Sequence, residues 1–175
     1  AYEITYGDWS SDVCSSDLRG ALSADASGVI ADAAAMARDK GLPLVMTMGS
    51  SGADIVEGVA ALHGWGRAAK QIASCSGVVP IVAAVTGPAV SGPALLIGLC
   101  DVVIMTEEAF AFVSGPTMVA EFTGVQVSNA ELGGADAHAR QSGVAQIVVP
   151  DRDAAVAEIE HVLAFLPDSV NERSE

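Results

Sequence analysis

Two glycine-containing segments, residues 49–58 (GSSGADIVEG) and 86–94 (TGPAVSGPA), each stand between a run of apolar residues and a helix-like pattern. The preceding runs are too short and too continuously apolar for surface helices, so they predict buried strands. Repeated strand–turn–helix units predict an α/β fold with a covered sheet. Glycine-lined turns can direct backbone N–H groups at one point, which stabilises a negatively charged oxygen without a catalytic side chain.

The composition limits the classes of function. With 175 residues, of which 51% are hydrophobic, the chain is expected to bury a sizeable core in one domain. The formal charge is −14 with only eight Lys and Arg, which disfavours nucleic-acid and membrane-surface binding. The three cysteines lack the close pairing of a zinc site or a disulfide framework, and this favours a reduced, cytoplasmic setting.

One stretch imitates a membrane span. Between residues 77 and 100 the only polar residues are Thr86 and Ser91. Three prolines and several glycines interrupt the stretch, so a buried strand–turn–helix explains it better. No secretory signal peptide is expected at the start of the chain.

Residues 8–18 (DWSSDVCSSDL) fit poorly with the Ala-rich, periodic sequence that follows them. They resemble, letter for letter, the translation of a common short-read sequencing adapter; the alternative is a natural Ser/Asp-rich loop. We expect residues 1–18 to be non-native, residues 19–167 to form the folded domain, and residues 168–175 to be a polar tail.

Periodicity and stop signals place the individual elements. Helices are expected at 23–40, 55–76, 93–99, 116–123, 129–132 and 151–166, and strands at 43–48, 78–85, 101–105, 109–113 and 146–149. The helix at 55–76 is expected to gather its apolar residues on one side, namely Val56, Val59, Ala60 and Leu62. Gly64 and Gly66 should weaken the middle of that helix.

The second turn is the first candidate site. It places the N–H groups of Ser91 and Gly92 at a helix N-terminus, where they would stabilise an oxyanion. Gly52 or Ala53 in the first turn would supply a partner donor. The alternative is a pair of plain tight turns without a ligand.

Side-chain catalysts are poorly represented. His63, His138 and His161 stand alone, and neither a nucleophile elbow nor a phosphate-binding or dinucleotide-binding loop is present. Glu57 and Glu131 are expected to be solvated, and Asp101 to be a hydrogen-bonded structural carboxylate. No metal ligand set is predicted.

Four segments resemble a known family: GADIVEGVAAL (52–62), SGVVPIVAAVTGP (76–88), FVSGP (112–116) and ELGGADAHARQSGVA (131–145). They are similar to the N-terminal domain of the carboxyltransferase (β) subunit of biotin-dependent acyl-CoA carboxylases, the acetyl-/propionyl-CoA carboxylase type. Residues 19–51 are similar more loosely.

This resemblance implies a crotonase/ClpP-like ββα spiral and the binding of an acyl-CoA thioester whose enolate accepts CO2 from carboxybiotin. The family's Gly-Gly pair, which holds the thioester oxygen, falls on Ser91 and Gly92. The implied partners are a biotin carboxylase with its biotin carrier, and the C-terminal carboxyltransferase domain of a neighbouring subunit in a homo-oligomer. We therefore expect this chain to be a fragment that is inactive alone.

The sequence also departs from the family pattern. Asp54 stands where the family has Arg, Val125 and Gln126 replace acidic residues, and Pro93 removes a possible third donor. Three alternatives stay open. A hydratase would need carboxylates at positions that hold Leu95 and Pro116. A decarboxylase subunit would share the same domain, and a non-catalytic assembly module is supported by Asp54.

Overall fold

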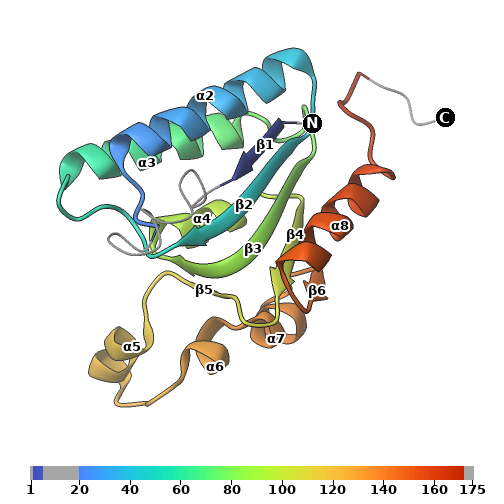
Figure 1. Cartoon of the computed structure of the whole chain (residues 1–175). Helices are drawn as coiled ribbons and strands as arrows, with labels where there is room; N and C mark the ends of the chain where they lie inside the picture. The colour runs from blue at the N-terminus through green and yellow to red at the C-terminus, as the bar shows by residue number, and fades with distance from the viewer. Residues whose placement is uncertain (1, 6–19, 172–175) are drawn as a thin grey trace.

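The computed structural model describes residues 2–5 and 20–171 (Figure 1). The proposed adapter-derived segment 8–18 and the end of the polar tail, 172–175, lie outside the described residues. The described part begins with strand β1 (Tyr2–Thr5), which pairs in parallel with β2 (Leu44–Ser50). The sheet thus includes residues that precede the expected domain start at Arg19.

Within the described residues the sheet has six strands, and its strands pair in parallel. The strand order is β1-β2-β3-β4-β6, with β3 spanning Ile81–Val90, β4 Val102–Thr106 and β6 Ile147–Val149. The short strand β5 (Phe110–Phe112) lies off this path and pairs with the end of β3. The continuous apolar strands are buried on both faces, as parallel strands usually are.

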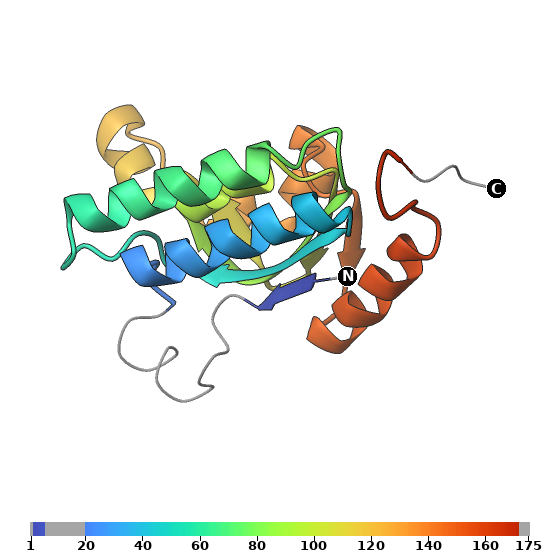
Figure 2. The same ribbon diagram turned by 90° about the horizontal axis from the view of Figure 1, so that it is seen from above.

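Helices cover both faces of the sheet, which confirms the α/β class. On one face, α2 (Ala24–Lys40) and α3 (Val59–Ala73) run side by side (Figure 2), and the short α4 (Gly92–Ile97) follows β3. On the other face lies α8 (Arg152–Leu163). Below the sheet in Figure 1 are α5 (Pro116–Thr123), α6 (Asn129–Gly133) and α7 (Ala135–Ala137), and a π-helical turn, His138–Ser142, follows α7.

Alternation along the strands divides the core into two clusters. Leu44, Ile81 and Met105 share one cluster with Ile72 of the α2–α3 layer, whereas Val82, Ile104 and their neighbours pack against α8.

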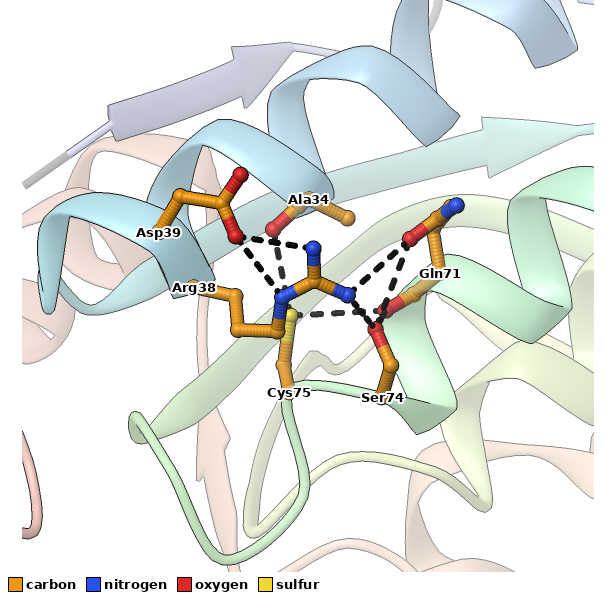
Figure 3. Close-up of polar contacts among 6 residues, drawn as sticks. All are labelled: Ala34, Arg38, Asp39, Gln71, Ser74 and Cys75. Atoms are coloured by element: carbon orange, nitrogen blue, oxygen red, sulfur yellow. Dashed lines mark hydrogen bonds and ion pairs between the residues drawn. The ribbon is translucent and has the colours of Figure 1, made fainter.

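The helix expected at 23–40 is confirmed as α2, with Ser23 as its N-cap rather than its first residue. The Ser23 hydroxyl accepts a hydrogen bond from the Ala26 N–H at 3.1 Å, and Gly41 ends the helix in the left-handed conformation. The C-terminal ends of α2 and α3 are joined by Arg38, whose guanidinium donates to Ser74 Oγ at 2.8 Å and to Asp39 Oδ1 (Figure 3).

The helix expected at 55–76 is observed as the shorter α3, and the apolar side expected for it is not the buried side. The large apolar residues Val56, Val59 and Leu62 are exposed, and the buried face consists of Ala61, Gly64, Ala68 and Ile72. A Cβ on Gly64 would lie 2.9 Å from the Ala24 Cα, so small residues allow α2 and α3 to pack closely. Close packing, rather than side-chain size, decides which face of α3 is buried.

Strand β3 is longer than expected. Residues 86–90, expected to form a turn, continue the strand because they pair with Ser50 on one side and with β5 on the other. The membrane-like stretch 77–100 is thus a buried strand followed by α4, as predicted. No helix among the described residues combines the length and apolar character that spanning a membrane requires.

Candidate active site

The two glycine-containing turns lie against each other. Ser50 at the end of β2 is in register with Ala89 near the end of β3. A Cβ built on Gly52 would lie 3.5 Å from the Val90 carbonyl oxygen and 3.6 Å from the Ser91 Cβ. The parallel pairing of β2 and β3 therefore brings together the two segments that the sequence singles out.

Ser91 is the single residue between β3 and α4 in the second turn. Among the described residues it is the non-glycine residue with a positive φ, at 62°, a conformation that disfavours a side chain. Its N–H donates a hydrogen bond of 3.0 Å to the Phe112 carbonyl of β5. This hydrogen bond belongs to the β3–β5 pairing. The Ser91 N–H is therefore already bonded within the protein, and Ser91 contributes to the turn through its backbone conformation.

Gly92 is the first residue of α4, and an N–H at this position has no acceptor within its own helix. The indole of Trp65, on α3, packs where a side chain of residue 92 would lie, with Nε1 only 2.8 Å from a built Cβ. Gly92 is thus required by sterics, because a side chain at this position would clash with the indole. The buried Trp65 Nε1 has no hydrogen-bond partner in the described structure.

Ala53 is the second candidate donor. Leu22 pairs with it through two hydrogen bonds, from Leu22 N–H to the Gly52 oxygen at 2.7 Å and from Asp54 N–H to the Leu22 oxygen at 2.9 Å. In a parallel bridge of this kind, the middle residue directs its own N–H away from the partner strand. The Ala53 N–H therefore points away from Leu22, and Gly52 (φ 120°) supplies the turn.

Ser50, which the sequence analysis did not single out, holds the first turn in place. Its fully buried hydroxyl donates to the Gly20 carbonyl at 2.6 Å and accepts from the Gly52 N–H at 3.3 Å. A serine at the end of an apolar strand and two residues before a glycine is the signal that could have identified it.

The acidic residues of the first turn bind backbone groups. Asp54, at the position of the family's Arg, is buried, and its Oδ1 accepts from the Val56 N–H at 2.8 Å. Glu57 is exposed, as expected, but its Oε2 accepts from the Ala24 N–H at 2.6 Å and so caps α2. Neither carboxylate is placed as a free base.

Other candidates also have structural roles. Asp101 accepts from the Ile81 N–H at 2.8 Å, which confirms its structural assignment. Hydrogen bonds from the backbone and hydroxyl of Ser128 lower the pKa of Glu131 in a capping box. His63 and His161 are exposed, whereas His138 is half-buried and contacts β5. Within the described part of the chain, no group of His, Cys, Asp or Glu side chains could hold a metal ion.

Comparison with known proteins identifies the class. The family model described as "Carboxyl transferase domain" matches residues 15–175, and the chain belongs to this family. The methylmalonyl-CoA carboxyltransferase 12S subunit of Propionibacterium freudenreichii subsp. shermanii is 38% identical over 134 residues, which is 77% of this chain and 26% of that protein. The propionyl-CoA carboxylase beta chain of Roseobacter denitrificans is 36% identical over 151 residues, 86% of this chain and 30% of that one.

The fold agrees with this assignment. The crystal structure of transcarboxylase 12S, with methylmalonyl-coenzyme A and methylmalonic acid bound, superposes with a TM-score of 0.87 at 35% identity. The match covers 89% of this chain and 31% of that one. The crotonase-like fold implied by the resemblance is therefore confirmed, and the chain spans less than a third of the length of these relatives.

Proposed function

We propose that this chain is the acyl-CoA-binding, N-terminal part of a biotin-dependent carboxyltransferase, and that the Gly92 and Ala53 N–H groups hold the thioester oxygen. The observation that carries the proposal is the contact between the two turns, through Gly52 and Ser91. Two donors from adjoining turns would stabilise the negative charge that develops on the thioester oxygen when its α-carbon loses a proton.

The turns themselves provide no base for that proton. Asp54 and Glu57 both accept hydrogen bonds from backbone N–H groups, and the Ser91 hydroxyl has no adjacent histidine in its turn. A site that offers backbone N–H donors and no base fits a reaction in which biotin, carried by a partner protein or domain, supplies both CO2 and the base. The role of the chain is then to bind the thioester, orient its α-carbon and stabilise the enolate.

The remaining parts of the enzyme would come from other segments. Ile55, Val56 and Val59, before and at the start of α3, are 91%, 86% and 81% exposed, next to the proposed site. An apolar surface of this kind suits coverage by another domain. We assign that role to the C-terminal carboxyltransferase domain of a neighbouring subunit, in a cytoplasmic homo-oligomer that also recruits the biotin carboxylase and biotin carrier.

The test compares Gly92→Pro with Gly92→Ala in the full-length subunit, assembled with its biotin-carrying partner. Both substitutions add a Cβ against Trp65, so both are made in a Trp65→Leu background that removes this clash. Only the proline deletes the N–H, and the kcat for acyl-CoA carboxylation should fall about 10²–10³-fold relative to the alanine variant.

The comparison is made on variants whose melting temperatures agree. Equal turnover of the two variants would exclude the Gly92 N–H as a donor. If the assembled parent protein binds no acyl-CoA thioester, the carboxyltransferase assignment itself fails, and the non-catalytic assembly module becomes the better explanation.

A further inference from the structure

The Ala111 carbonyl of β5 is buried on the side of the strand that faces away from β3. Strand β5 pairs with β3, and the Phe112 carbonyl faces β3 because it accepts the Ser91 N–H at 3.0 Å. Successive carbonyls of a strand point in opposite directions, so the Ala111 carbonyl points away from β3. Ala111 is only 4% exposed, and a buried carbonyl needs a donor from elsewhere in the fold.

His138 supplies that donor. Its Nε2 lies 2.8 Å from the Ala111 carbonyl oxygen, and because a carbonyl can only accept, Nε2 must carry the proton. The other ring nitrogen, Nδ1, lies 2.8 Å from Ser142 Oγ, and this oxygen in turn accepts from the Val144 N–H at 3.3 Å. The imidazole is therefore held at both nitrogens.

Gly133 also packs against the Ala111 carbonyl. A Cβ on Gly133 would lie 2.1 Å from the Ala111 oxygen, so only glycine allows this approach. Phe110 and Gly134 form an isolated bridge next to it. The segment 133–142 thus anchors β5 through the edge that β3 leaves open.

We propose that His138 is a positioning residue for the thioester-oxygen site, an inference that rests on the function proposed above. It acts through two hydrogen bonds in series: His138 holds Ala111, and the next carbonyl of β5, on Phe112, holds the Ser91 N–H. Ser91 adopts an unfavourable positive φ, so its turn depends on outside restraint. When the His138 anchor is lost, a three-residue strand can shift, and the Ser91 turn no longer directs the Gly92 N–H at the thioester oxygen.

Three substitutions in the full-length, assembled subunit separate positioning from general stability. His138→Gln keeps an N–H donor near the position of Nε2, His138→Asn is too short to reach Ala111, and His138→Leu removes the donor. His63→Leu, at an exposed histidine of α3, is the matched control. Two probes are titrated: free CoA, and a CoA thioether carrying a nitroalkyl chain, whose nitronate resembles the thioester enolate.

We expect His138→Leu and His138→Asn to weaken binding of the nitronate probe, and to lower kcat, by about 10–100-fold, with free CoA binding within about twofold of the parent. His138→Gln should recover most of both losses, and His63→Leu should change neither. If His138→Leu fails to assemble, the Gln and Asn pair decides the question.

Two results would overturn the inference. Unchanged nitronate binding in His138→Asn means that the histidine does not position the site. Equal loss of free CoA and nitronate binding means that its role is purely structural. A parent protein that binds the nitronate no better than free CoA contradicts the proposed function instead, so the two failures are distinguishable.

Discussion

The indole of Trp65 and the backbone of Gly92 are in direct contact, although they lie 27 positions apart and on different helices. A Cβ on Gly92 would lie 2.8 Å from Nε1 and 2.9 Å from Cδ1 of the ring, which is closer than real Cβ contacts come. The α3 layer therefore fixes the identity of the residue that carries the proposed oxyanion donor.

Gly92→Ala should consequently destabilise the fold by about 1–3 kcal/mol, as overpacking does elsewhere. In a Trp65→Leu background the same substitution should cost less than half as much, because the ring no longer opposes the methyl group. Denaturant unfolding of the four proteins measures both costs, and an identical cost in the two backgrounds would show that the clash is not the cause.

Removing the Glu57 carboxylate should weaken the start of α2. Glu57 Oε2 accepts from the N–H of Ala24, the first residue of that helix, so Glu57→Ala should lower the free energy of unfolding by about 1 kcal/mol. Glu108→Ala, at an exposed glutamate in the turn before β5, is the control and should be neutral. Equal effects would mean that net charge, rather than capping, explains the change.

The contact of Arg38 with Ser74 should appear as an energetic coupling between α2 and α3 (Figure 3). A double-mutant cycle with Arg38→Ala and Ser74→Ala should give a coupling free energy of about 0.5–1 kcal/mol, modest because the Arg38 side chain is one-third exposed. Strictly additive losses would indicate that the two residues act separately.

The two described cysteines should resist alkylation in the folded protein. Burial raises the pKa of the Cys75 thiol, against the opposing effect of the Arg38 charge, and burial with the nearby Asp101 raises the pKa of Cys100 to about 12. A raised pKa leaves little thiolate, so iodoacetamide labelling should be at least about tenfold slower than in guanidinium. Mass spectrometry must assign each site, because Cys14 lies outside the described residues. Equally fast labelling before and after unfolding would contradict the prediction.

Glu131 should contribute stability that depends on pH. Hydrogen bonds from Ser128 lower its pKa in the folded state, so the contribution is present above the unfolded-state pKa and is lost as the pH falls through the folded-state pKa. The melting temperature of Glu131→Gln should be below that of the parent at about pH 7 and should approach it at about pH 3. A difference that stays constant across this range would rule out the carboxylate as its source.

Much of the framework could be predicted from local patterns. Ser23 and Gly41 delimit α2, and the apolar runs before the two turns form β2 and β3. The α/β class followed from these runs, and the family from four short motifs, two at the turns and two at residues 112–116 and 131–145. These features depend on neighbours within a few residues, and periodicity and capping chemistry report such interactions directly.

Contacts between distant segments could not be predicted in this way. The sequence pattern favoured Val56 and Val59 as the apolar side of α3, yet Gly64 packs on Ala24 and those valines are exposed. Likewise, β5 pairs with β3 rather than with β4, its predecessor in the chain, and this pairing engages the Ser91 N–H that the sequence offered as a donor.

The amino-acid sequence by itself thus determined most of the elements, the fold class and the two turns in which a site can form. The tertiary structure decided that the turns meet, that Trp65 excludes a side chain at Gly92, and that His138 reaches the Ala111 carbonyl of β5. The physical reason is that such contacts depend on how closely two backbones approach, and small residues set that distance without leaving a periodic signal in the sequence.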